Sequence, residues 1–137
     1  MRTRADLVRG WLLKAEADLA SARLCLSAGE ALDTACFHAQ QAAEKYIKAY
    51  LIACEVPFPF IHNLEKLVEL CISRDPSFWQ IRTMAQNLTP YAVELRYDLE
   101  FWPSAETAQK ALDMALAIRE FVLTRIPEDM SQADSPR

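Results

Sequence analysis

Residues 37–51 read FHAQQAAEKYIKAYL, and this stretch decides the fold of the chain. At helical spacing, the stretch and its flanks carry an apolar stripe at intervals of three and four, formed by Leu32, Cys36, Ala39, Ala43, Ile47, Tyr50 and Cys54. A second line, on another face, holds an amide, a carboxylate and an ammonium at Gln41, Glu44 and Lys48. The spacing therefore predicts one long helix over 30–55 with a packing face and a polar face.

The sequence on both sides of this stretch predicts further helices. A similar apolar stripe predicts a helix over 5–28, which Gly29 ends, and the short link makes the first two helices antiparallel neighbours. Two prolines then break the chain at 56–61, in a loop whose Phe58 and Phe60 we expect to be covered. Capping residues, prolines and apolar spacing predict the remaining helices over 64–73, 76–88, 91–96 (short and kinked) and 104–126.

Glycine content and chain length define the fold class. The chain has only two glycines and no Asn-Gly or Asp-Gly hairpin signal, which argues against β-structure. Its 137 residues are enough for one core. The sequence predicts a single all-α domain over 1–127, an up-and-down bundle of four main helices plus one or two short helices. Residues 128–137 are polar and lack periodicity, so we expect a flexible C-terminal tail there.

Composition excludes several classes of function. The net charge is −4, so the surface as a whole does not suit a phosphate backbone. No apolar run reaches the roughly 20 residues of a membrane span, and residues 1–6 lack the apolar segment expected of a signal peptide. The four cysteines form no C-x-x-C pair and read as small apolar residues of a cytoplasmic protein. The sequence marks out no metal site and no cofactor.

Three places carry polar groups that suit a site. In the first, the line of Gln41, Glu44 and Lys48, the last two also form an i,i+4 ion pair that is common on solvated helix faces. The second is His62, which stands at a helix start, where a cap or a packed loop residue is the ordinary role. The third is the charged segment with Arg96 and Tyr97, whose arginine suits a carboxylate or phosphate but also suits a local ion pair.

Taken together, these places resemble the HEPN domain family, a family of small helical proteins. The family phrase A-x-x-D-L is matched by Ala15, Asp18 and Leu19. The phrase after it, centred on Gln-Gln-Ala-x-Glu-Lys, is matched by Phe37, Gln40, Gln41, Ala42, Glu44, Lys45, Lys48, Ala49 and Leu51. His-x-Leu-x-x-Leu is matched by His62, Leu64 and Leu67, and Glu-x-Arg-Tyr by Glu94, Arg96 and Tyr97. The resemblance spans roughly residues 8–125.

The resemblance implies a helical bundle that usually dimerises. It also implies that six positions converge near one groove: Gln41, Glu44, Lys48, His62, Arg96 and Tyr97. Family members often act with a small nucleotidyltransferase, frequently as toxin and antitoxin, and others are metal-independent ribonucleases. The ribonuclease motif places a His a few residues after an Arg, but here Phe101, Trp102 and Pro103 follow Arg96 at that distance. Ribonuclease activity by that route is therefore not expected.

Three functional hypotheses follow. The first is a homodimeric binding module that partners a nucleotidyltransferase or holds a nucleotide or phosphate in the polar groove, as in a toxin–antitoxin module. The second is a divergent ribonuclease toxin that uses His62 and Arg96 on RNA, the only catalytic residues we would name. The third is a structural protein in which the polar groove is the dimer seam. We favour them in the order first, third, second.

Overall fold

The structure, a computed structural model, describes residues 2–131. Within these residues it contains six α-helices, two short 3-10 helices and no strand. The predicted all-α fold is thus confirmed. None of the helices in this part of the chain is long and apolar enough to cross a membrane.

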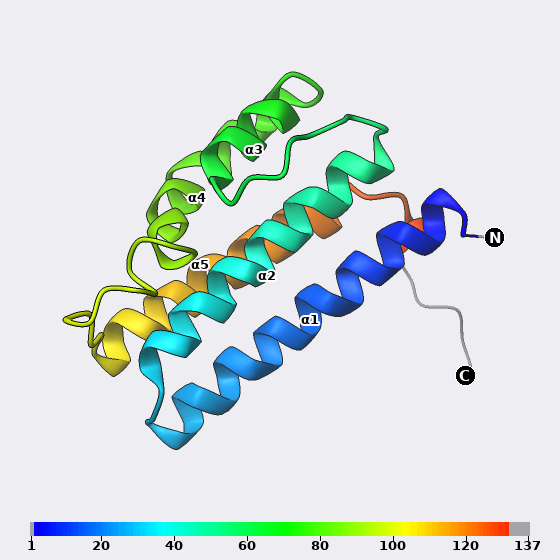
Figure 1. Cartoon of the computed structure of the whole chain (residues 1–137). Coiled ribbons are helices and arrows are strands. Elements are labelled where there is room, and N and C mark those ends of the chain that lie inside the picture. Colours follow the sequence, from blue (N-terminus) through cyan, green and yellow to red (C-terminus); the bar gives the residue numbers. More distant parts are fainter. Residues whose placement is uncertain (1, 132–137) are drawn as a thin grey trace, which may run out of the picture.

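The two longest helices are antiparallel neighbours, as expected from the short link between them (Figure 1). Helix α1 spans Arg4–Ala28 and begins with a capping box, in which Thr3 Oγ1 accepts from the Asp6 amide and the Asp6 carboxylate accepts from the Thr3 amide. These bonds and the neighbouring Arg9 hold the pKa of Asp6 below its ordinary value. Gly29 ends α1 at a φ of 68°. Helix α2 spans Leu32–Ala53 and starts slightly later than predicted, because Ala31 is also left-handed.

The middle of the chain forms shorter elements than the sequence suggested. Helix α3 spans Leu64–Ile72 and is capped by the Asn63 side chain. The single helix expected over 76–88 is instead the 3-10 helix η1 (Pro76–Ile81) followed by α4 (Arg82–Leu88), because the backbone of Ile81, at φ −106° and ψ 2°, departs from the α-helical conformation. The continuation expected over 91–96 is reduced to η2 (Thr89–Tyr91) and a series of turns. Pro90 at the start of η2 supplies no backbone N–H, which limits the hydrogen bonding of this segment.

The C-terminal part of the chain also departs from expectation. Helix α5 spans Ala105–Leu123 and begins at the predicted Ser104 cap. Helix α6 (Glu128–Ser131) then forms where a flexible tail was expected to begin. The amides of Met130 and Ser131 donate to the carbonyl of Pro127, and the Arg9 guanidinium of α1 donates to the Asp129 carbonyl. This tertiary contact has no signal in the local sequence pattern, and residues 132–137 of the expected tail lie outside the described residues.

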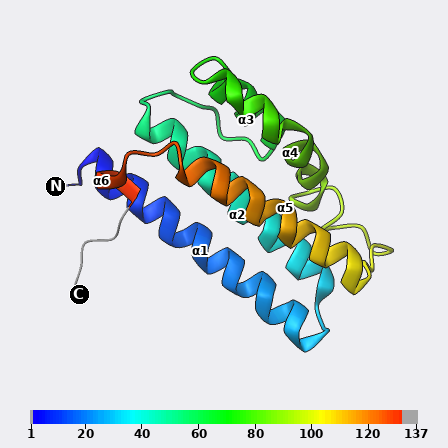
Figure 2. The same ribbon diagram turned by 180° about the vertical axis from the view of Figure 1, so that it is seen from behind.

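Helix α2 lies at the centre of the bundle. Figures 1 and 2 show α1 and α5 beside it, α3 and α4 on the side away from α1, and α6 close to the start of α1. More than half of the residues in α2 are buried, including the members of the predicted apolar stripe from Cys36 to Tyr50. Leu32 and Cys54, at the two ends of that stripe, are half-buried. The loop from 54 to 63 leaves the end of α2 and returns along the same helix to reach α3 (Figure 1). That return path brings His62 over the middle of α2.

The apolar loop itself is only half covered. Phe58 is half-buried and packs against the core, as expected, but Phe60 is fully exposed, so the expectation was wrong for that residue. Both rings lie within 6 Å of the Lys48 ammonium, at 5.7 and 5.9 Å from ring centroid to Nζ. The loop therefore serves partly to surround a cation, which its composition alone does not reveal.

Candidate functional site: a buried polar network on α2

A continuous polar network runs along the buried side of α2. Gln40, Glu44 and Lys48 are all buried, one helical turn apart. Gln40 Nε2 donates to Glu44 Oε1 at 3.2 Å, and Lys48 Nζ donates to Glu44 Oε2 at 3.1 Å. Gln40 Nε2 also donates to the backbone carbonyl of His62 at 3.2 Å. Buried polar groups are stable only when they are paired, and here each one meets its partner inside the network.

His62 connects this network to solvent. Its Nδ1 lies 2.9 Å from Glu44 Oε1, and its side chain is 57% exposed. An ionised carboxylate only accepts hydrogen bonds, so Nδ1 carries a proton, and Nε2 has no partner within residues 2–131. A buried carboxylate thus orients an exposed imidazole. In chemical terms, this arrangement presents a hydrogen-bonding ring nitrogen at the surface in a fixed direction.

Lys48 is enclosed rather than free. Its ammonium lies 5.8 Å from the Trp11 ring centroid as well as near the two phenylalanines of the loop. Its charge is neutralised by Glu44 at 3.1 Å. An enclosed and paired lysine supports the structure around it more readily than it reaches out to a ligand.

Sequence reasoning identified the neighbouring amide but missed the central one. Gln41 is half-buried and joins the network through its side-chain amide, which donates to Gln40 Oε1 at 2.7 Å. Gln40 is the residue that reaches Glu44 and the His62 carbonyl. The available signal was the strict spacing of four residues from Gln40 to Glu44 to Lys48, which places all three on one line of a helix.

Arg96 and Tyr97 belong to the turns after η2 and lie near a different part of α2, the part that carries Phe37. The Arg96 guanidinium carbon is 4.2 Å from the centroid of the Phe37 ring and 5.6 Å from that of Tyr97. Phe37 precedes Glu44 by two helical turns, which is about 10 Å along the axis. In the described part of the chain no hydrogen bond or ion pair joins Arg96 or Tyr97 to the network. The structure therefore brings together Gln41, Glu44, Lys48 and His62, and holds Arg96 and Tyr97 as a separate group.

A second polar cluster ties α1 to α2. The carboxylate of Asp18, which is buried, lies 2.8 Å from His38 Nδ1 and 2.5 Å from Lys45 Nζ. Asp18 stands beside Leu19 within the apolar stripe of α1, and an acid at such a position indicates a buried charge with a partner on a neighbouring helix. Sequence reasoning quoted Asp18 and Lys45 as family positions without giving them a role.

The cysteines form no site in the described chain. All four are free thiols, and no group of three His, Cys, Asp or Glu residues within 2–131 could hold a metal ion. Cys36 and Cys71 are buried, as the apolar reading predicted, whereas Cys25 and Cys54 are half-buried. Burial raises the pKa of the Cys36 thiol to about 11 and raises that of Cys71 as well.

We expect thiol reactivity to follow this division. With a disulfide reagent such as Ellman's at pH 8, Cys25 and Cys54 should react with the native protein while Cys36 and Cys71 stay protected, because a thiol of pKa about 11 holds roughly one thiolate in a thousand at that pH. In denaturant all four should react. Mass spectrometry of the labelled peptides identifies the sites, and rapid native labelling of Cys36 would contradict the burial described above.

Comparison with known proteins agrees with this architecture. The family model of the HEPN domain matches residues 8–126. Among solved structures, ST0689, described as an archaeal HEPN homologue, superposes with a TM-score of 0.70 and 26% identity, covering 88% of this chain and 98% of its own. TT1696 from Thermus thermophilus superposes with a TM-score of 0.69 and 28% identity, covering 87% and 98%. A search of curated proteins finds no match. Glu44 and Lys48, two of the positions that resemble the family pattern, form an ion pair along α2. Because the family model matches most of its length, the chain belongs to the HEPN domain family.

Proposed function

We propose that this chain is a binding module rather than an enzyme, and that it docks a partner protein through the loop between η2 and α5. We call residues 93–102 the aromatic loop. The observation that supports the proposal is its set of exposed large apolar side chains: Val93, Tyr97, Leu99 and Trp102. Exposed apolar patches of this kind mark interaction surfaces, and Trp, Tyr and Arg dominate binding energy at protein interfaces.

Two contacts with the rest of the bundle fix the position of the aromatic loop. Phe101 stacks on Tyr91 with ring centroids 5.7 Å apart, and Arg96 packs over Phe37 of α2. The Tyr91 ring is half-buried, and burial raises its pKa above the ordinary value. Because the loop is held at Arg96 in its middle and at Phe101 near its end, its outward side chains lose little freedom when a partner binds.

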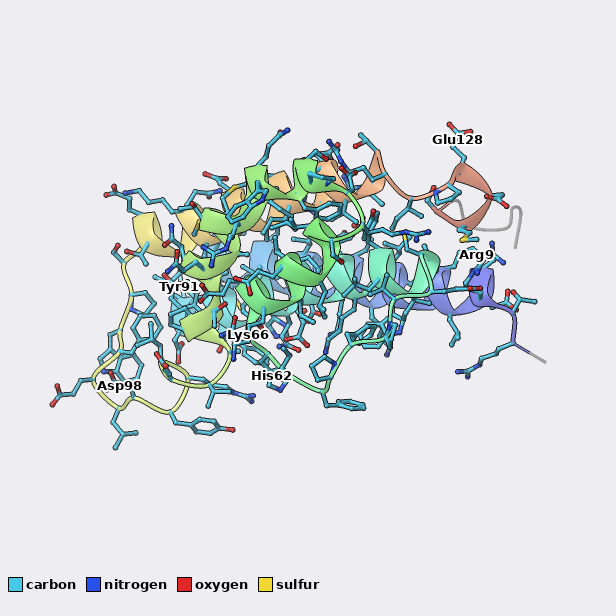
Figure 3. All side chains as sticks on the ribbon, turned by 90° about the horizontal axis from the view of Figure 1, so that it is seen from above. Arg9, His62, Lys66, Tyr91, Asp98 and Glu128 are labelled. Atoms are coloured by element: carbon cyan, nitrogen blue, oxygen red, sulfur yellow. The ribbon has the colours of Figure 1, made fainter. Side chains whose placement is uncertain are left out.

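The polar network on α2 reaches solvent, through His62, on the side of the molecule that carries the aromatic loop. Figure 3 shows His62 and Asp98 on one side of the molecule, so the exposed imidazole and the aromatic loop open in the same direction. A partner seated on the loop would find Arg96, the exposed ring nitrogen of His62 and the half-buried Gln41 as polar contacts. In this proposal Glu44 and Lys48 position His62 and do not themselves touch the partner.

Charge favours a protein over a nucleotide or RNA at this face. The aromatic loop carries three acids, Glu94, Asp98 and Glu100, against the single cation Arg96, while Lys48 is enclosed. The family resemblance supplies the partner class, a nucleotidyltransferase acting with this chain as a two-part, toxin–antitoxin-like module in the cytoplasm. A divergent ribonuclease has weaker support, because His62 and Arg96 are anchored two helical turns apart on α2.

The test is co-purification of the tagged protein from its native host, with bound proteins identified by mass spectrometry. We expect a stoichiometric nucleotidyltransferase with the wild type. Trp102→Ala should lower its recovery about 30-fold or more, the loss that a hot-spot residue of about 2 kcal/mol produces. Trp79→Ala, at another exposed tryptophan on η1, is the matched control and should leave recovery unchanged.

Two results would contradict the proposal. One is equal recovery of the partner with Trp102→Ala and the wild type. The other is a wild-type homodimer without any nucleotidyltransferase, which Trp102→Ala converts to a monomer in light scattering. That second result would favour the structural hypothesis, with the aromatic loop as a dimer seam.

A further inference from the structure

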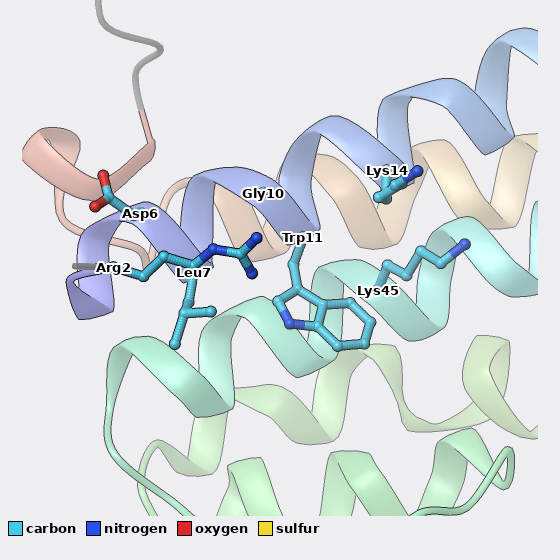
Figure 4. A pocket seen from close by; sticks show the side chains of 7 residues that line it. All are labelled: Arg2, Asp6, Leu7, Gly10, Trp11, Lys14 and Lys45. Carbon is cyan, nitrogen blue, oxygen red and sulfur yellow. The ribbon is translucent and has the colours of Figure 1, made fainter.

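The faces of α1 carry hollows of different character. A broad, open hollow of about 740 Å³ follows the seam between α1 and α2, and Trp11, Lys14 and Lys45 are among the residues that line it (Figure 4). A smaller hollow of about 160 Å³ lies on another face of α1, where α1, α2, α5 and α6 meet. Figure 2 shows α6 close to the start of α1 and to the end of α5. We call the smaller one the Tyr46 hollow, because Tyr46 is the residue through which α2 reaches it.

Tyr46 brings an unpaired polar group to the Tyr46 hollow. The residue is fully buried, and its hydroxyl has no hydrogen-bond partner within residues 2–131. The other lining residues belong to α1, α5 and α6, so the far end of the Tyr46 ring, which carries the hydroxyl, is the part that faces the hollow. Buried hydroxyls in folded proteins nearly always have a partner. A phenylalanine would fill the same core position without an unpaired group, so the hydroxyl indicates a partner from outside residues 2–131.

The charged side chains around the Tyr46 hollow are already paired. Arg119 of α5 donates from Nε to Glu16 of α1 at 2.8 Å. Arg9 of α1 donates to the Asp6 carboxylate at 2.9 Å and to the Asp129 carbonyl at 3.0 Å. Because each guanidinium faces a carboxylate, the hollow suits a neutral ligand better than an ion. The bonds of Arg119 and Arg9 also connect α1 to α5 and α6, so the walls are held in place before a ligand arrives.

Three leucines form the apolar walls of the Tyr46 hollow. Leu12 is buried and Leu123 is half-buried, whereas Leu13 is 57% exposed and stands at the mouth. An apolar cavity of about 150 Å³ can hold a benzene ring. The 160 Å³ of the Tyr46 hollow therefore suits a single ring with one small substituent.

We propose that the Tyr46 hollow binds a small, neutral, mainly apolar molecule with one hydrogen-bonding group, the chemistry of a phenol. The ring packs against the three leucines, and the polar group forms the hydrogen bond that the Tyr46 hydroxyl lacks. The hollow lies in the half of the bundle that carries the N-terminus, whereas the aromatic loop lies at the opposite end (Figure 1). The proposal therefore does not depend on partner docking at the aromatic loop.

Titration of the ¹⁵N-labelled full chain, followed by NMR, tests the class of ligand. Phenol carries ring and hydroxyl, toluene carries a ring of similar size without a polar group, and benzoate carries a charge. We expect phenol to shift the amide signals of Leu12, Tyr46 and Leu123 in a saturable way. Benzoate should bind at least about 10-fold more weakly, because its charge would meet no unpaired cation. Absence of saturable phenol binding, or benzoate binding as tightly as phenol, would overturn the proposal.

Tyr46→Phe tests the hydrogen bond, because it removes only the hydroxyl. It should weaken phenol binding about 5-fold, the effect of losing one ordinary hydrogen bond, and leave toluene binding unchanged. The melting temperature of Tyr46→Phe should stay equal to that of the wild type or rise, since the hydroxyl is buried without a partner. Equal phenol affinity in the two proteins, or a melting temperature lowered by several degrees, would contradict the assigned role of the hydroxyl.

A variant at the mouth places the binding in the Tyr46 hollow. Leu13→Trp should block the entrance and weaken phenol binding at least about 10-fold. Leu24→Trp, at another exposed leucine of α1, is the matched control and should bind phenol like the wild type. Circular dichroism verifies that both variants are folded. Phenol binding that Leu13→Trp leaves unchanged would show that the ligand sits elsewhere and would overturn the proposal.

Discussion

Replacing Glu44 with alanine is expected to lower the free energy of unfolding by about 3–5 kcal/mol. Glu44 is buried, and its two oxygens hold Gln40, Lys48 and His62. Without it the Lys48 ammonium stays enclosed by aromatic rings with no counter-charge. Urea denaturation measures this difference in the free energy of unfolding. The two unfolding curves are fitted with a common m-value, the slope of the free energy against urea concentration.

Two further variants test whether the loss comes from the unpaired charge of Lys48. Glu44→Leu combined with Lys48→Met removes both charges and keeps the volume, so it should recover most of the lost stability. His62→Ala removes a side chain that is 57% exposed and should cost far less. If Glu44→Ala were as stable as the wild type, Glu44 and Lys48 would be solvated rather than buried on α2.

Replacing Phe78 with alanine is expected to lower the free energy of unfolding by about 3–5 kcal/mol as well, for a different reason. Phe78 of η1 is fully buried, with its ring centroid 4.4 Å from that of Tyr50 on α2 and 5.0 Å from that of Phe121 on α5. The substitution leaves a cavity where three elements meet. Thermal and urea unfolding report the loss directly.

Phe60 is the matched control for this substitution. It is also a phenylalanine outside the main helices, but it is fully exposed, so Phe60→Ala should cost no more than about 1 kcal/mol, the contribution of an exposed cation–π contact with Lys48. Comparable losses for the two variants would contradict the burial of Phe78 between α2 and α5. Together, Phe78→Ala and Phe60→Ala distinguish an aromatic residue that packs in the core from one that lies at the surface.

Most of the helices could be predicted from local sequence, because their signals are local. Apolar spacing marks the inward face of α1, α2 and α5, and Ser104 and Asn63 cap helices where the sequence places them. The errors fall where a distant contact decides the outcome. Helix α6 is joined to Arg9 of α1, 120 residues earlier in the chain, and no local pattern reports such a contact.

In the candidate site, too, the local sequence predicts some features and the tertiary structure decides the others. The sequence by itself determined that Glu44 and Lys48 share a helical line, since residues four apart must do so. Only the tertiary structure decided that Gln40 is the central amide, that His62 reaches Glu44, and that Arg96 packs on Phe37 instead of joining them. A hollow lined by Gly10, Trp11 and Lys45 likewise exists only where α1 meets α2. Helical spacing follows from backbone geometry within a few residues, whereas burial and charge pairing depend on which distant segments the packed core brings together.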